Sequence, residues 1–138
     1  MSTNDCIFCK IVSGEVPCKK IYEDEAVLAF LDIRPVSDGH TLVVPKAHFE
    51  KLHQCPPEVL SKVGSCVGRI VQAVVGAVGA AGYNVLCNNG RVAGQLVDHV
   101  HFHIIPRNEG DEVFTRWPMY EYEQGRADAI AAKICERL

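Results

Sequence analysis

The chain has 138 residues, of which 48% are hydrophobic and 22% are charged, and its formal net charge is −3. This length and composition predict one globular domain with a core of its own. A negative chain without a basic run does not favour nucleic acid as a partner. Seven scattered cysteines fit a reducing compartment better than a disulfide framework. The first residues lack a secretory signal pattern, so we expect the cytoplasm as its compartment, with the nucleus as the alternative.

The first part of the chain predicts one short helix and three strands. The helix covers Ile7–Val12, and the strands cover Lys19–Tyr22, Ala26–Leu31 and Thr41–Val44. The first two strands are linked by only three residues, and short links predict antiparallel neighbours.

A long amphipathic helix is predicted next. Apolar residues recur at spacings of three and four from Val59 to Val78, which is typical of a helix packed on a sheet. Pro57 suits the first turn, and Gly82 is expected to end the helix. The apolar stretch is nearly long enough for a membrane span, but Arg69 and Gln72 interrupt it, so we expect no membrane partner.

The last part of the chain predicts two more strands, over Tyr83–Cys87 and His99–Ile105, and a helix over Ala127–Glu136. The fold class is therefore predicted to be α+β, with a five-stranded antiparallel sheet, one long helix and short helices. We expect a single domain over residues 1–138, in which residues 108–138 form a C-terminal extension.

Histidine at every second position of one predicted strand is the strongest functional signal. His99, His101 and His103 would project from one face, roughly 6–7 Å apart, while the apolar residues between them face the core. Imidazole changes charge near neutral pH, so metal binding, acid–base chemistry and nucleophilic attack are all candidates. The wide spacing favours separate roles around an extended anionic group over chelation of one ion by all three.

The loop Asn88–Gln95 carries two glycines and leads into the histidine strand. Glycine lets the backbone approach phosphate oxygens closely, and side-chain amides add neutral donors. Loops of this kind are more often plain hairpin connections. Beside three histidines, however, this loop indicates a phosphate site that faces a nucleophile.

These blocks together resemble the histidine triad (HIT) superfamily, and the compact histidine triad nucleotide-binding proteins most of all. The resemblance runs from Cys6 to about Arg107, and it includes the stretches 30–35 and 39–46. It implies a two-fold homodimer in which two sheets join and the long helix lies at the interface. Gly64 and Gly68 inside that helix are compatible with close approach of a partner helix.

The resemblance implies an enzyme that acts at the α-phosphorus of purine nucleotide derivatives. It would convert a nucleoside 5′-phosphoramidate to the monophosphate through a covalent nucleotidyl-histidine. His101 matches the nucleophile, and the backbone carbonyl of His99 would hold its other ring nitrogen; His103 and His40 match the remaining active-site histidines. Two alternatives stay open, a dinucleoside polyphosphate hydrolase and a nucleotide-binding regulatory module with weak catalysis.

The resemblance also implies a nucleotide site. Asn88, Gly94 and Gln95 match phosphate contacts, and Asp32 matches the acid that bonds the ribose hydroxyls. An apolar slot for the base would be formed by Ile7, Phe8, Ile11, Phe30 and Ile33, for each of which plain core packing is the competing interpretation. Leu96 stands where many relatives have Ser or Thr beside the phosphate.

Cys6 and Cys9 form a Cys-x-x-Cys pair, which is half of a tetrahedral zinc site. Members of the superfamily with this pair imply His48 and His99 as the other two ligands of a structural Zn²⁺. Two unrelated buried thiols are the alternative. We expect no organic cofactor.

Overall fold

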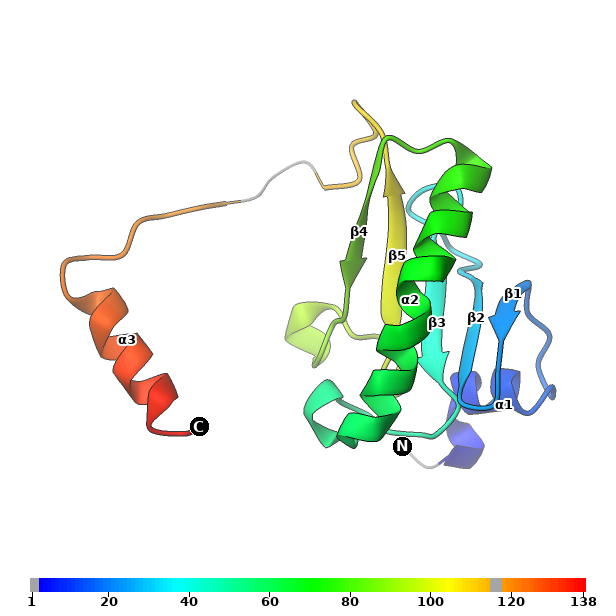
Figure 1. The fold of residues 1–138 in the computed structure, drawn as a ribbon, viewed down its shortest axis with the longest axis horizontal. Coiled ribbons are helices and arrows are strands. Elements are labelled where there is room, and N and C mark those ends of the chain that lie inside the picture. The colour runs from blue at the N-terminus through cyan, green and yellow to red at the C-terminus, as the bar shows by residue number, and fades with distance from the viewer. Residues whose placement is uncertain (1–2, 115–117) are drawn as a thin grey trace.

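The computed structural model describes residues 3–114 and 118–138. Its body is one antiparallel sheet in the spatial order β1-β2-β3-β5-β4 (Figure 1). The strands are β1 (Lys20–Glu23), β2 (Val27–Leu31), β3 (Thr41–Pro45), β4 (Gly82–Leu86) and β5 (Phe102–Arg107). The helices are α1 (Ile7–Val12), α2 (Pro57–Val78) and α3 (Arg126–Cys135), with short 3-10 turns at Thr3–Asp5, Leu52–Gln54 and Arg91–Ala93. The predicted α+β class and the five antiparallel strands are confirmed.

Helix α2 lies along one face of the sheet (Figure 1). Pro57 occupies its first turn, as predicted, but the helix ends at Gly79 instead of Gly82. Gly79 adopts a left-handed φ of 67° that glycine accepts at little cost, and its N–H donates to the Val75 carbonyl. Gly82, the residue expected to end the helix, begins β4 instead.

The buried stripe of α2 forms a core with the sheet, and it consists of Val63, Cys66, Ile70, Val71 and Val74. By length and composition alone, α2 is long and apolar enough to cross a membrane. In this structure its apolar stripe packs instead against Val27, Val43 and Ile104 of the sheet, as the amphipathic pattern predicts.

A second core lies on the opposite face of the sheet, where α1 packs. Phe8 of α1 and Cys6 contact Leu28, Phe30 and Leu42 there. Strand β2 is buried on both faces, because alternate residues enter the two cores. The face covered by α1 is the one on which the histidines gather.

The predicted strand over His99–Ile105 differs from the observed strand, since β5 begins only at Phe102 and continues to Arg107. The backbone before Phe102 bonds elsewhere: the Val100 N–H donates to the Phe49 carbonyl at 2.7 Å. His99 and His101 therefore precede the strand, and only His103 lies on it.

Candidate active site

Four histidines, namely His40, His99, His101 and His103, lie beside the antiparallel strands β3 and β5. His40 directly precedes β3, His103 lies on β5, and the rings of His101 and His103 are 5.0 Å apart. Phe8 packs edge-on against the rings of both His99 and His101. The side chains of His40, His99 and His101 are buried.

The hydrogen bond of His101 determines which of its ring nitrogens is free. Nδ1 lies 2.6 Å from the backbone carbonyl oxygen of His99, and a carbonyl only accepts, so Nδ1 carries the proton. Burial lowers the pKa of His101, against the raising effect of that hydrogen bond, so the ring is neutral at neutral pH. Nε2 of His101 therefore carries an unprotonated lone pair, which a nucleophile requires.

The same argument assigns the protons of His40 and His103. The Val36 N–H donates to Nδ1 of His40 at 3.1 Å, so Nε2 of His40 carries a proton and donates to Nδ1 of His103 at 2.8 Å. His103 therefore carries its proton on Nε2, a buried atom without a hydrogen-bond partner in the part of the chain that the structure describes. Burial, followed by repulsion from His101 and His40, lowers the pKa of His103 to about 4.

Asp32 lies beside this pair, with a carboxylate oxygen 3.7 Å from Nε2 of His40. The ligand atoms of Asp32, His40 and His103 are close enough to hold a metal ion. The proton on Nε2 of His40 makes them a poor metal site, because a ligating nitrogen must offer a lone pair.

A largely apolar cavity of about 380 Å³ opens beside His101 and His103. All the side chains predicted for the nucleoside line it, namely Ile7, Phe8, Ile11, Phe30, Asp32 and Ile33. Phe8 and Phe30 are also core residues, whereas Ile33 is 87% exposed and Ile7 lies partly open. Core packing alone therefore does not account for Ile7 and Ile33.

The loop before the histidines turns at Gly94, whose φ is 93°. A Cβ added there would lie 3.3 Å from the side-chain amide of Asn88, so these two residues are neighbours. Gly94 and the exposed Leu96 line the cavity. The loop thus brings two of the three predicted phosphate residues close together.

Gln95, the third, is buried, and its amide is engaged within the protein. Its Oε1 accepts from the Gly90 N–H at 2.8 Å, and its Nε2 donates to the carbonyls of Glu50 and Val97. In this conformation Gln95 holds the loop in shape, and its contact with a phosphate stays a prediction.

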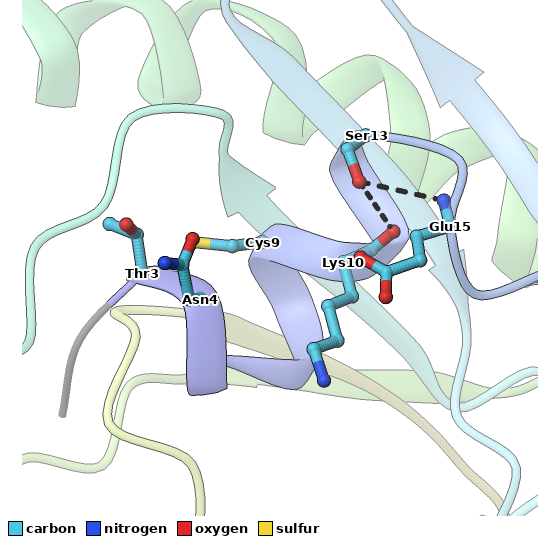
Figure 2. Close-up of a pocket in the computed structure, with 6 residues that line it drawn as sticks. All are labelled: Thr3, Asn4, Cys9, Lys10, Ser13 and Glu15. Carbon is cyan, nitrogen blue, oxygen red and sulfur yellow. Dashed lines mark hydrogen bonds between the residues drawn. The ribbon is translucent and has the colours of Figure 1, made fainter.

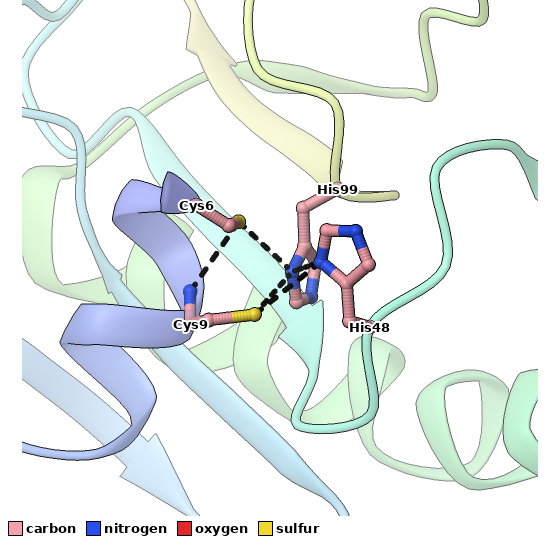
Figure 3. A group of neighbouring side chains, drawn as sticks. All are labelled: Cys6, Cys9, His48 and His99. Atoms are coloured by element: carbon pink, nitrogen blue, oxygen red, sulfur yellow. Dashed lines mark hydrogen bonds between the residues drawn. The ribbon is translucent and has the colours of Figure 1, made fainter. Parts of the chain in front are cut away.

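Cys6, Cys9, His48 and His99 form a second cluster, whose ligand atoms all lie within 4.8 Å of one another (Figure 3). Cys9 Sγ is 3.3 Å from His48 Nδ1, and Cys6 Sγ is 3.5 Å from His99 Nδ1. Nε2 of His99 donates to the Pro45 carbonyl at 2.8 Å, so Nδ1 offers a lone pair to the cluster. Two sulfurs and two imidazole nitrogens are a donor set that suits zinc.

A different depression lies beside α1 and the 3-10 turn Thr3–Asp5 (Figure 2). It is lined by Thr3, Asn4, Cys9, Lys10, Ser13 and Glu15. Ser13 bonds locally there, to the Lys10 carbonyl and the Glu15 N–H. None of the four histidines predicted for the active site lines it, so the apolar cavity beside His101 is the candidate active site.

Sequence reasoning missed several groups that shape this site, including Val16, Pro17, Cys18 and Val97 of the cavity lining. The Val36 N–H and the Pro45 carbonyl determine which ring nitrogens of His40 and His99 carry the proton. Every residue has such backbone groups, so the sequence does not indicate which of them bond a histidine. Leu42 also lines the cavity. Leu42 lies on a strand whose residues are all apolar or buried, so no alternation in the sequence indicates which side of the sheet it faces.

The sheet, the single long helix and the buried histidines beside a cavity define a histidine triad protein. The HIT domain family matches residues 13–110, and the chain belongs to this family. The adenosine 5′-monophosphoramidase hnt1 of Schizosaccharomyces pombe is 46% identical over 96% of this chain and 98% of its own.

Two solved structures are also similar. A crystal structure of a HIT family member from Bacillus subtilis is 42% identical, covers 97% of both chains and has a TM-score of 0.91. A zinc-bound histidine triad family protein from Mycobacterium smegmatis is 40% identical, covers 99% of this chain and all of its own, and has a TM-score of 0.76.

Proposed function

We propose that this protein is an adenosine 5′-monophosphoramidase, which hydrolyses the P–N bond of an adenosine 5′-phosphoramidate to release AMP. The observation that carries the proposal is the lone pair on Nε2 of His101, fixed by the 2.6 Å bond to His99 and placed beside a cavity suited to a nucleoside. The activity of the full-length relative from Schizosaccharomyces pombe supports it.

In the first step, Nε2 of His101 attacks the α-phosphorus, an N–P bond forms, and the bond to the leaving nitrogen breaks. When an anionic phosphoryl group lies beside His103, the His40–His103 pair takes up one proton from solvent, and Nδ1 of His40 holds it once the Val36 N–H releases that nitrogen. The Nε2–H of His103 then donates a proton to the leaving nitrogen, which departs as a neutral amine. Because its hydrogen bond fixes the ring of His101, no rotation is needed before attack.

In the second step, water attacks the phosphorus of the nucleotidyl-histidine and the bond to Nε2 of His101 breaks. The proton of the attacking water passes to the His40–His103 pair, which returns to its state before turnover. AMP leaves, and the net reaction consumes one water molecule per P–N bond.

The cavity supplies the binding contacts in this proposal. Its apolar side chains take the purine, and the Asp32 carboxylate accepts hydrogen bonds from the ribose hydroxyls. The side-chain amide of Asn88, beside Gly94, donates to a phosphate oxygen. The apolar side chain of Leu96 offers no hydroxyl there, which favours an apolar leaving group.

We further propose that Cys6, Cys9, His48 and His99 hold a structural Zn²⁺. All four ligands come from protein, so the ion would link α1 to the segment before β5 without an open position for substrate. The zinc-bound relative from Mycobacterium smegmatis supports this assignment. We also propose a cytoplasmic homodimer, with its two sheets joined.

The experiment that tests the activity compares wild type, His101→Ala and the matched control His53→Ala, whose exposed ring lies outside the cluster. We expect wild type and the control to cleave adenosine 5′-phosphoramidate, and His101→Ala to lose at least about 10³-fold in kcat. Efficient cleavage of diadenosine polyphosphate by wild type would instead indicate a dinucleoside polyphosphate hydrolase. AMP binding with cleavage of neither substrate would overturn the enzyme and leave a nucleotide-binding module.

A further inference from the structure

Asn88 and Asn89 are neighbours at the start of the loop before the histidines, but their side chains have different surroundings. The Asn88 amide lies beside Gly94, and within residues 3–114 and 118–138 it forms no hydrogen bond with the protein. The Asn89 amide is bonded at both ends. Its Oδ1 accepts from the Leu52 N–H at 2.7 Å, and its Nδ2 donates to the Cys87 carbonyl at 3.3 Å. Asn88 can therefore bind a ligand, whereas Asn89 is engaged within the protein.

The bond to Leu52 joins the loop to a segment 37 residues away along the chain. Leu52 is the first residue of the 3-10 turn Leu52–Gln54, and the first N–H groups of a helical turn have no partner inside it. Oδ1 of Asn89 satisfies this N–H. The segment is also fixed from its other side, because the Phe49 carbonyl accepts the Val100 N–H at 2.7 Å. Asn89 thus ties the loop to a firmly held part of the body.

The same segment holds the other end of the loop. Nε2 of Gln95 donates to the Glu50 carbonyl at 2.7 Å, and Gln95 is only 1% exposed. Residues 50–52 therefore form one hydrogen bond with Asn89, near the start of the loop, and one with Gln95, at its end. The loop has two anchors, and both are attached to one short stretch of backbone.

Each anchor directly adjoins one of the residues that meet at the proposed phosphate site. Asn89 follows Asn88, and Gln95 follows Gly94, so each anchor restrains the residue before it. Gly90 and Gly94, which lie between the anchors or beside them, have φ values of 91° and 93°. Glycine loses more backbone freedom on folding than any other residue. A loop with two such glycines therefore depends on its anchors to keep one shape.

We propose that Asn89 is a positioning residue, which holds the Asn88 amide where it donates to the α-phosphate and does not touch the nucleotide itself. The inference rests on the proposed nucleotide site and adds to it a residue that does not line the cavity. In the part of the chain that the structure describes, Asn89 bonds only Leu52 and Cys87. Loss of these bonds would release the backbone beside Asn88 and leave the apolar nucleoside end of the cavity unchanged.

The test compares two ligands of the full chain, AMP and adenosine, in calorimetric titrations, because only AMP carries the phosphate. Asn89→Ala should raise the Kd of AMP at least about tenfold, since a hydrogen bond to a charged group is lost. The Kd of adenosine should stay equal to that of wild type. General damage to the fold would weaken both ligands alike, so the comparison distinguishes positioning from a merely structural role.

Asn108→Ala is the matched control. Oδ1 of Asn108 accepts from the Ala81 N–H at 3.0 Å, so this variant also removes a bond from an asparagine oxygen to a backbone N–H. Asn108 follows Arg107 at the end of β5, whereas His103 lies toward the beginning of that strand. The control should bind both AMP and adenosine as wild type does.

A second pair of variants tests the bond itself. Leu52→Pro removes the N–H that Asn89 accepts from, and proline suits the first position of a helical turn. Lys51 before it is already extended, with φ −127° and ψ 153°, as a residue before proline should be. Leu52→Ala keeps the N–H and should bind AMP as wild type does. Leu52→Pro should weaken AMP binding as Asn89→Ala does, and both changes together should weaken it no further.

The outcomes separate the role of Asn89 from the proposed activity. Unchanged AMP binding in Asn89→Ala, or equal losses for AMP and adenosine, would overturn the positioning role. Additive losses in the double variant would contradict it as well, because the two residues would then act independently. If wild type binds AMP but cleaves no phosphoramidate, the proposed activity fails, and a selective loss of AMP in Asn89→Ala still supports the positioning role. Wild type that binds neither ligand would refute both.

Discussion

Gly39 lies at a close contact between α2 and the sheet, directly before His40, a residue of the proposed active site. Its φ is 88°, in the left-handed region that favours glycine. A Cβ added to Gly39 would lie 2.9 Å from Cγ1 of Val78 and 3.3 Å from Pro106 Cγ and Val74 Cγ1. Gly39→Ala therefore meets both a backbone penalty and a packing penalty.

The two penalties are separable by a matched control. A left-handed conformation costs an L-residue about 1–2 kcal/mol, and forcing a methyl into a filled core costs about 1–3 kcal/mol. Gly39→Ala should therefore lower the free energy of unfolding by about 2–5 kcal/mol. Gly14 has a similar φ of 83° with nothing within 4 Å of an added Cβ, so Gly14→Ala should lose only about 1–2 kcal/mol.

Urea unfolding of wild type and the two variants, with the slope of each transition compared, measures both values. The difference between the variants isolates the contacts of Gly39 with Val78, Val74 and Pro106. Equal losses in Gly39→Ala and Gly14→Ala would show that the added methyl is accommodated, and would refute the close packing of the loop on the end of α2.

Two further predictions concern the histidines and the cysteines. Burial lowers the pKa of His103 from 6.5 in the unfolded chain to about 4 in the folded protein. Between these two pH values the unfolded chain binds a proton that the folded protein does not, so the free energy of unfolding falls as the pH drops through this window. Wild type should lose up to about 2 kcal/mol of unfolding free energy between pH 7 and pH 5 from this group, and His103→Asn should lose less over the same range in urea titrations. Zinc released to a chromophoric chelator measures occupancy of the proposed metal site. Purified wild type and the control Cys18→Ser, whose residue lies outside the cluster, should each release about one zinc per chain, whereas Cys9→Ser should release far less. Equal zinc in all three proteins would contradict the proposed site.

The sequence predicted every helix and strand named above, and for α2 the basis was apolar periodicity, which reports which face of an element meets the core. It failed at boundaries that long-range bonds decide. Alternation carries through His99 to Ile105, but the Phe49 carbonyl takes the Val100 N–H and delays the strand. Gly79 and Gly82 look equivalent in sequence, and only the adoption of a left-handed φ by Gly79 ends the helix there.

The sequence predicted which residues form the candidate site better than it predicted how those residues bond to one another. The spacing of the histidines and the Cys-x-x-Cys pair point to the two clusters, and the resemblance to a known family adds His40 and His48. Residue types do not predict histidine tautomers. The tautomers of His40 and His101 each depend on a single backbone group, at Val36 and His99 respectively. The structural use of the Gln95 amide could not be predicted for the same reason, because its partners are backbone groups of Gly90, Val97 and the distant Glu50.

His99 connects the two clusters through two different parts of one residue. Its ring is held between the Pro45 carbonyl on Nε2 and the Cys-His cluster on Nδ1, while its backbone carbonyl accepts from Nδ1 of His101. Because the strand starts only at Phe102, this carbonyl bonds a side chain and takes no part in the strand ladder. A cation held by Cys6 and Cys9 would fix the ring of His99, and with it the carbonyl that sets the proton of His101. In the proposed mechanism the cluster therefore acts on His101 by positioning and does not touch the substrate.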